Sequence, residues 1–186
     1  PSKLKGLKGI ETTDNYKKAI LDKEVSLIIE LTGAIDFSYK LFEEASNEGK
    51  HFITANKALL SKKLLDMFAI ARKNKTYIGF EASVAGGIPI IKTIRNYLIG
   101  NKILDIEGII NGTTNYILTK MTDENLEFNT ALKKAQELGF AEADPTMDIS
   151  GGDAASKLAI LASISFNQNI QYDDVIKEGI DKIDLM

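Results

Sequence analysis

The sequence predicts an α/β protein, in which a doubly wound parallel sheet with helices on both faces is followed by an α+β part. One observation is that three short apolar segments alternate with helical segments at the spacing of parallel βαβ units. These strand candidates are SLIIEL (26–31), HFITAN (51–56) and YIGFEA (77–82). A second observation is a change in the residue pattern after Ala82, where two glycines, a proline and further helical segments follow. We therefore expect one domain over residues 1–80 and a second over residues 81–186.

The helices between the strand candidates follow from apolar spacing and from signals at their ends. Residues 37–49 have a helical pattern, and Gly49 is placed to end that helix. Residues 58–75 form a second amphipathic segment. After the third strand candidate, Pro89 is expected at the first position of a helix that runs to Gly100.

The second half of the sequence predicts one longer strand and three more helices. ILDIEGIING (103–112) is a β-type run, and helical patterns cover residues 113–121 and 129–139. An acidic loop then leads into the apolar helical segment KLAILASISF, which begins with Lys157.

Composition limits the classes of function. A chain of 186 residues with 44% hydrophobic and 26% charged residues can form a good-sized core. The formal net charge of -3 and the scattered lysines argue against nucleic-acid binding, and no apolar run approaches the roughly 20 residues of a membrane span. The lack of cysteine excludes disulfides and a thiol nucleophile, and the single histidine excludes multi-histidine metal sites. We expect a cytoplasmic protein without nucleic-acid or membrane partners.

The stretch AEADPTMDISGGDAASK (141–157) crowds four carboxylates ahead of one lysine, Lys157. The carboxylates are those of Glu142, Asp144, Asp148 and Asp153. In a structural interpretation, Ser150 and Asp153 form a capping box, and Asp153 pairs with Lys157 four residues later on one helix face. In a functional interpretation, the carboxylates converge on a cationic group of a substrate while Lys157 donates or takes a proton. This stretch taken alone leaves both interpretations open.

Three further motifs carry polar groups at expected strand ends and turns. Lys57, in TANK (54–57), follows the carboxyl end of a parallel strand, where open α/β sheets bind ligands. EASVAGGIP (81–89) offers the Glu81 carboxylate and several backbone carbonyls, a set that suits a hard cation, with a monovalent ion at least as plausible as a divalent one. NGTTNYIL (111–118) forms a turn whose N–H groups can bind an anion. Each motif also has a structural interpretation, as a helix-start lysine, a glycine-rich turn or a helix cap.

Taken in order, TANKALL, EASVAGGIPII, GIINGTTNYILTKM and ELGFAEADPTMDISGGDAASKLAIL resemble homoserine dehydrogenase, and ELTG at 30–33 fits the same pattern. The resemblance implies a partial Rossmann-like dinucleotide-binding domain over residues 1–80. It implies a substrate-binding and dimerisation domain over residues 81–186. The implied activity is NAD(P)H-dependent reduction of L-aspartate 4-semialdehyde to L-homoserine, on the route to threonine, methionine and isoleucine. The implied partners are this amino-acid substrate and a second copy of the chain.

The resemblance also implies roles for individual residues. Lys157 is similar to the proton donor for the aldehyde oxygen, and Lys57 to a second possible acid–base residue. The positions that match substrate-binding carboxylates are Glu142, Asp148 and Asp153. The positions that match residues near the cofactor are Thr32, Lys57 and Gly139. The positions that match a monovalent cation site, for sodium, are Glu81 and the backbone at Val84, Gly86 and Ile88.

The sequence departs from the family pattern at both ends. It has no G-x-G-x-x-G phosphate turn, because GLKGI at 6–10 lacks the spacing, a preceding strand and a following helix. Family members also continue beyond the position of Met186. We therefore interpret the chain as an internal fragment, in which the unit that normally selects NADH or NADPH is missing.

Two alternative functions remain consistent with the sequence. A divalent-metal-dependent hydrolase or phosphotransferase would use the acidic cluster as oxygen ligands and would not need Lys157. The lack of a phosphate-binding glycine loop argues against it. A non-catalytic dimerisation module would keep a dehydrogenase-like shape, and the missing nucleotide turn favours this alternative.

Overall fold

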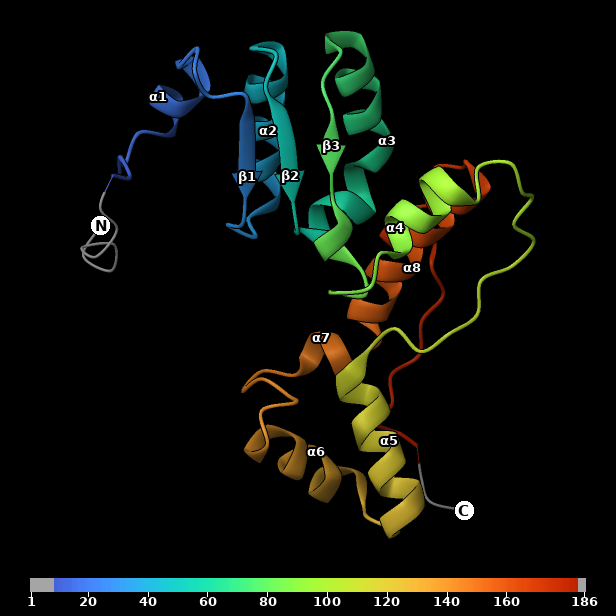
Figure 1. The fold of residues 1–186 in the computed structure, drawn as a ribbon. Helices are drawn as coiled ribbons and strands as arrows, with labels where there is room; N and C mark the ends of the chain where they lie inside the picture. Colours follow the sequence, from blue (N-terminus) through green and yellow to red (C-terminus); the bar gives the residue numbers. More distant parts are fainter. Residues whose placement is uncertain (1–8, 184–186) are drawn as a thin grey trace.

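The computed structural model describes residues 9–183 and confirms an α/β fold with a parallel sheet (Figure 1). The strands lie in the order β1-β2-β3 and comprise β1 (Leu27–Glu30), β2 (His51–Thr54) and β3 (Ile78–Gly79). Phe52 of β2 lies opposite Ile28 of β1 and Ile78 of β3, and both pairings are parallel. Gly6–Lys8, the start of the GLKGI stretch, lie outside the described residues.

Two helices supply the crossovers that parallel strands require. They are α2 (Ile35–Asn47) and α3 (Lys57–Asn74), and a short helix that the sequence did not predict, α1 (Tyr16–Leu21), precedes β1. The side chain of Asn56 accepts a hydrogen bond from the N–H of Leu59 at 3.0 Å and so caps the start of α3. Lys75 adopts a left-handed conformation, with φ of 57°, where α3 ends. Capping by Asn56 therefore fixes the position of Lys57 at the start of α3.

One face of the sheet is packed and the other is open, so the expectation of helices on both faces is wrong for the described residues. Figure 1 shows α2 and α3 on the same side of the sheet. Phe52 is buried on that side against Phe42 of α2, whereas Ile29 of β1 is 60% exposed. Right-handed crossovers between strands added in one direction place their helices on one face, which explains the arrangement.

The segment after β3 changes direction through short helical turns. These are η2 (Glu81–Ser83), α4 (Ile90–Lys92) and the π-helical turn η3 (Thr93–Tyr97). Pro89 precedes α4 as its N-cap and is not its first helical residue. The expected helix after Pro89 thus forms, but its last turn is wider than an α-helix.

The expected strand over residues 103–112 is wrong for the part of the chain that the structure describes. These residues run without a sheet partner up to α5 and form the long yellow-green loop of Figure 1. Leu104 and Ile109 are each 77% exposed, whereas Ile106 packs against the core. A strand needs ladder partners for its N–H and C=O groups, and no element within residues 9–183 pairs with this segment.

The remaining helices form the second part of the molecule. They are α5 (Gly112–Glu124), α6 (Phe128–Glu137), α7 (Thr146–Ile149), α8 (Gly152–Phe166) and the 3₁₀ turn η4 (Tyr172–Asp174). A small separate core that includes Ile117 of α5 and Ala131 of α6 holds the first two together. The main core instead includes Ile160 and Leu161 of α8, and α8 packs against α3.

The expected capping box between Ser150 and Asp153 is wrong. Ser150 is the C-cap of α7, and Gly151 adopts a left-handed conformation, with φ of 79°, before α8 begins. A Cβ atom at Gly151 would lie 3.1 Å from the carbonyl oxygen of Glu178. This tight turn places Asp153 in the first turn of α8 without a side-chain cap. None of the described helices is long and apolar enough to span a membrane.

Candidate active site

The two candidate lysines line one cleft between the sheet and the second part of the molecule. The cleft has a volume of about 580 Å³ and is bordered by Lys57, Lys157, Asn111 and Gly112. Lys57 is the first residue of α3, just past the carboxyl end of β2, and Lys157 lies in the second turn of α8. The carboxyl edge of a parallel sheet is where the sequence predicted a ligand site, and the cleft lies there.

A buried carboxylate, Asp153, joins the two lysines. Its Oδ2 lies 2.7 Å from Nζ of Lys157, and its Oδ1 forms an ion pair with Lys57. Its side chain is 4% exposed, whereas that of Lys157 is 18% exposed and that of Lys57 is 43% exposed. Burial raises the pKa of Asp153, but hydrogen bonds from Lys157, Lys57 and Asn111 outweigh burial and hold this pKa below its ordinary value. Asp153 is therefore ionised at neutral pH.

Asn111 is a member of this cluster that the sequence analysis did not single out. Its Nδ2 donates to Oδ1 of Asp148 at 2.7 Å and to Oδ2 of Asp153 at 2.8 Å. Its Oδ1 accepts a hydrogen bond from the N–H of Thr114 at 2.8 Å, so the same side chain caps α5. The N-G-T-T start of a helix was a usable signal for the cap, but nothing local indicated contacts 37 and 42 positions away.

Lys157 is held from two sides. Besides Asp153, its Nζ donates to the backbone carbonyl of Ile110 at 2.9 Å. Its position is therefore set by α8 and by the segment before α5, whereas Lys57 is more exposed. A partly buried ammonium with a fixed direction suits proton donation to a substrate oxygen in the cleft.

Only two of the four carboxylates in the acidic stretch join the cluster. Asp153 contacts both lysines, and Asp148 contacts Asn111. Asp144 instead accepts hydrogen bonds from Thr146, at 2.6 Å from its Oγ1, which hold the pKa of Asp144 below its ordinary value. Glu142 is exposed on the loop before α7 and contacts neither lysine. Within residues 9–183 no three acidic or histidine side chains are grouped to hold a metal ion, so the divalent-metal alternative lacks a ligand set there.

Glu81 holds the start of α4. Its Oε1 and Oε2 accept hydrogen bonds from the N–H groups of Ile91, at 2.9 Å, and Lys92, at 3.0 Å. The carbonyls of Val84 and Gly86 accept no hydrogen bond from the described residues, whereas that of Ile88 accepts one from Ile90. Both carboxylate oxygens of Glu81 thus cap α4, and the cation site stays a prediction from the sequence.

Thr32 and Gly139 lie outside the lining of the cleft. Thr32 follows β1, and its hydroxyl donates to Oε1 of Glu30 at 2.7 Å. Glu30 is buried at this edge and also accepts a hydrogen bond from the Thr54 hydroxyl at 2.6 Å, so it ties the ends of β1 and β2 together. Gly139 adopts φ of 78° at the end of α6, and this left-handed conformation explains why a glycine occupies the position. Glu30 was not among the residues predicted for the site.

The site includes the starts of three helices. α3 begins at Lys57, α5 begins at Gly112 and α8 begins at Gly152. Lys57 and Gly112 line the cleft, and Asp153 of α8 pairs with Lys57 at its edge.

Comparison with protein families gives a match to homoserine dehydrogenase over residues 89–186. Curated relatives include the homoserine dehydrogenase of Bacillus subtilis, which is 45% identical over 176 residues, covering 95% of this chain and 40% of the relative. The homoserine dehydrogenase of Synechocystis is 43% identical over 168 residues, covering 90% of this chain and 39% of the relative. This chain therefore spans about two fifths of the length of these relatives.

Solved structures with the same fold carry the same name. A homoserine dehydrogenase from Thiobacillus denitrificans is 44% identical, with a TM-score of 0.91 over 98% of this chain and 42% of that chain. A hyperthermophilic archaeal homoserine dehydrogenase in complex with NADPH is 26% identical, with a TM-score of 0.83 over 97% of this chain and 56% of that chain.

Proposed function

The chain belongs to the homoserine dehydrogenase family, and on this basis we propose that the intact protein is a cytoplasmic NAD(P)H-dependent enzyme that reduces L-aspartate 4-semialdehyde to L-homoserine. The observation that carries the proposal is the pair of lysines on opposite sides of Asp153 in one cleft. Such a cleft supplies a proton donor and fixed charges around a small polar substrate. The relatives' shared name supports the same reaction.

In the proposed reaction the residues of this chain bind the substrate and supply the proton. Lys157 donates a proton from Nζ to the aldehyde oxygen, which becomes the hydroxyl oxygen of the product. Lys57, the more exposed lysine, lies at the junction of cofactor and substrate and directs the same oxygen. When bound, the reduced nicotinamide supplies the hydride that the carbonyl carbon takes up.

The substrate carries an ammonium group, for which we propose carboxylate partners. Asp148 and Asp153 are already oriented by Asn111. Glu142 is exposed on the adjoining loop, and its carboxylate is available to a ligand. We assign these three residues to substrate binding.

We propose that the cofactor lies along the carboxyl edge of the sheet, with Thr32, Lys57 and Gly139 near it. A Cβ atom placed on Gly33 after β1 would meet nothing within 4 Å, so the backbone there is open to a ligand. The proposed domain boundary is near residue 80, where β3 ends and the chain leaves the sheet. The relative in complex with NADPH supports a dinucleotide cofactor.

We also propose a bound monovalent cation, sodium, with a structural role. Its ligands are the Glu81 carboxylate and the carbonyls of Val84, Gly86 and Ile88. Its role would be to hold the segment between β3 and α4, which borders the cleft. Replacing sodium by choline at constant ionic strength should lower the melting temperature of the intact protein, and Glu81→Gln should remove that difference. Equal melting temperatures in both salts would remove sodium from the proposal.

The proposed homodimer forms through residues 103–111. This segment has a strand-like sequence, exposes Leu104 and Ile109, and has no ladder partner within residues 9–183. Pairing in a sheet would satisfy its backbone groups and cover these side chains.

The experiment for the activity is oxidation of NADH or NADPH by the intact protein in the presence of aspartate semialdehyde. We expect substrate-dependent oxidation, with kcat about 10²- to 10⁴-fold lower in Lys157→Ala. Lys62→Ala removes an exposed charge of α3 away from the cleft and serves as the matched control, with kcat unchanged. A folded intact protein that oxidises neither cofactor would contradict the proposal and favour the non-catalytic module.

A further inference from the structure

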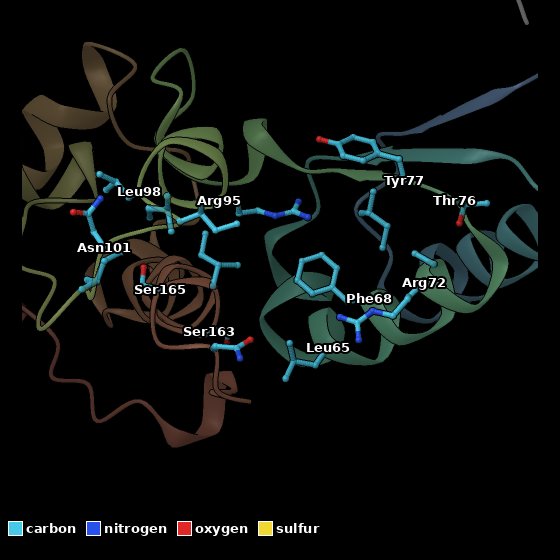
Figure 2. A pocket seen from close by; sticks show the side chains of 17 residues that line it. Leu65, Phe68, Arg72, Thr76, Tyr77, Arg95, Leu98, Asn101, Ser163 and Ser165 are labelled. Carbon is cyan, nitrogen blue, oxygen red and sulfur yellow. The ribbon is translucent and has the colours of Figure 1, made fainter.

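The two helices that begin at the lysine cleft, α3 and α8, end beside a second cavity (Figure 2). This cavity has a volume of about 690 Å³. Its lining includes Phe68 and Arg72 from the second half of α3, Arg95 from η3, and Ser163 and Ser165 from the end of α8. None of these residues borders the lysine cleft.

Both arginines of the sequence, Arg72 and Arg95, line this one cavity. Neither forms an ion pair or donates a hydrogen bond to any residue in the range 9–183, although the chain has 26 acidic residues. Lysines, in contrast, supply every ion pair of the described residues. The cavity therefore concentrates unneutralised guanidinium charge.

Arg95 is held in place without using its N–H groups. Its Cζ lies 4.9 Å from the ring centroid of Phe68 and 5.4 Å from that of Phe80. Stacking of this kind uses the flat face of the guanidinium and leaves its edge donors for another partner. Figure 2 shows Arg95 and Arg72 both extending toward Phe68.

Ser165 of the cavity lining has a buried polar atom without a partner. The Oγ of Ser165 is buried and is the one buried side-chain oxygen or nitrogen of residues 9–183 that makes no hydrogen bond. Buried polar atoms are normally satisfied, and an exception calls for an explanation.

The backbone that carries Arg95 is also unusual. Thr93–Tyr97 form a π-helical turn, a conformation that is rare and frequent at functional sites. It places Arg95 in the cavity between α3 and α8.

From these four observations we propose that this cavity binds a small organic anion. Its carboxylate or phosphate group lies against the edges of Arg72 and Arg95. Guanidinium groups match both anions through paired N–H donors. The occupant contacts the far ends of the two helices that carry Lys57 and Lys157.

The test measures anion binding and does not depend on any catalytic activity. Isothermal titration of the intact protein with succinate and with inorganic phosphate, at constant ionic strength, gives the two dissociation constants. We expect saturable binding of at least one probe, and the tighter probe identifies the anionic group. Succinamide, which lacks the charge, should not bind.

The variants separate a built site from general attraction to positive charge. Arg72→Gln alters an exposed side chain and should raise the dissociation constant about tenfold or more. Lys73→Gln makes the same charge change one residue later, outside the cavity lining, and should leave it within about twofold. Arg95→Lys keeps the charge but loses the paired donors and should also weaken binding. Absence of saturable binding, or equal weakening by Arg72→Gln and Lys73→Gln, would overturn the proposal.

Discussion

The Nζ atom of Lys157 lies 2.7 Å from Oδ2 of Asp153, one turn earlier on the same helix. Because Oδ1 of that carboxylate also holds Lys57 of α3, one buried side chain connects two cations from distant parts of the sequence. Asn111 donates a further hydrogen bond to Oδ2 of the same carboxylate.

Replacing Asp153 by asparagine should destabilise the protein in a pH-dependent way. The pKa of Asp153 in the folded state is below the ordinary value of 3.8, so its contribution is fully present above that pH and is lost as pH falls through the lower folded-state pKa. We expect Asp153→Asn to lower the free energy of unfolding by about 1.5–3 kcal/mol at pH 7, with the difference shrinking below about pH 3.8. Urea denaturation between pH 3 and pH 8 measures it.

Asp66→Asn on the exposed face of α3 is the control for that series, since its contact with Lys63 is solvent-exposed. It should change the free energy of unfolding by less than about 0.5 kcal/mol at every pH. A difference for Asp153→Asn that stays constant at acid pH would show that its charge is not what matters.

Replacing Asn111 by alanine should weaken substrate binding and lower catalytic efficiency. The change removes a donor shared by Asp148 and Asp153 and leaves both proposed substrate-binding carboxylates less well oriented. Loss of one hydrogen bond to a charged group corresponds to a fall in kcat/KM of about tenfold to a hundredfold. Steady-state kinetics of the intact protein measure kcat and KM, and the exposed Asn169→Ala is the control. An unchanged kcat/KM would exclude Asn111 from positioning the site.

Replacing Glu30 by glutamine should destabilise the sheet edge. The carboxylate accepts hydrogen bonds from Thr32 and Thr54, and a glutamine amide would turn a donor toward those donors. We expect a loss of about 1–3 kcal/mol in the free energy of unfolding, measured by urea denaturation at pH 7. The exposed Glu24→Gln, on the loop before β1, should have almost no effect. Equal stability of the two variants would mean that the network contributes nothing.

Replacing Gly151 by alanine should disturb the turn between α7 and α8. The left-handed conformation alone costs a side chain about 1–2 kcal/mol, and the new Cβ would lie 3.1 Å from the carbonyl oxygen of Glu178. Gly100→Ala, where nothing lies within 4 Å of a Cβ, provides the comparison and should be nearly neutral. Thermal unfolding of both variants measures the difference. If Gly151→Ala melts no lower than Gly100→Ala, the turn is not strained by a side chain.

The sequence predicted those features that depend on neighbouring residues. The alternation of apolar segments and helices identified the three strands, and the spacing of four placed Asp153 and Lys157 on one face. The position of Lys57 at the carboxyl end of β2 was likewise readable from the order of elements.

For features that depend on distant contacts, the sequence-based predictions were absent or wrong. Asn111 and Glu30 act through partners that only the fold brings near, and Ser150 lost its expected capping role to the conformation of Gly151. The 103–112 segment has a strand sequence but no partner within the described residues, because pairing is a property of two segments.

The starts of α3, α5 and α8 at one cleft have an electrostatic consequence. Each helix presents a partial positive charge at its first turn, since the peptide dipoles there are aligned and several N–H groups have no intrahelical partner. The starts of α3 and α5 line the cleft itself, so their backbone groups favour a negative charge there without moving. In the proposed reaction, an aldehyde oxygen that gains electron density would be stabilised in this way.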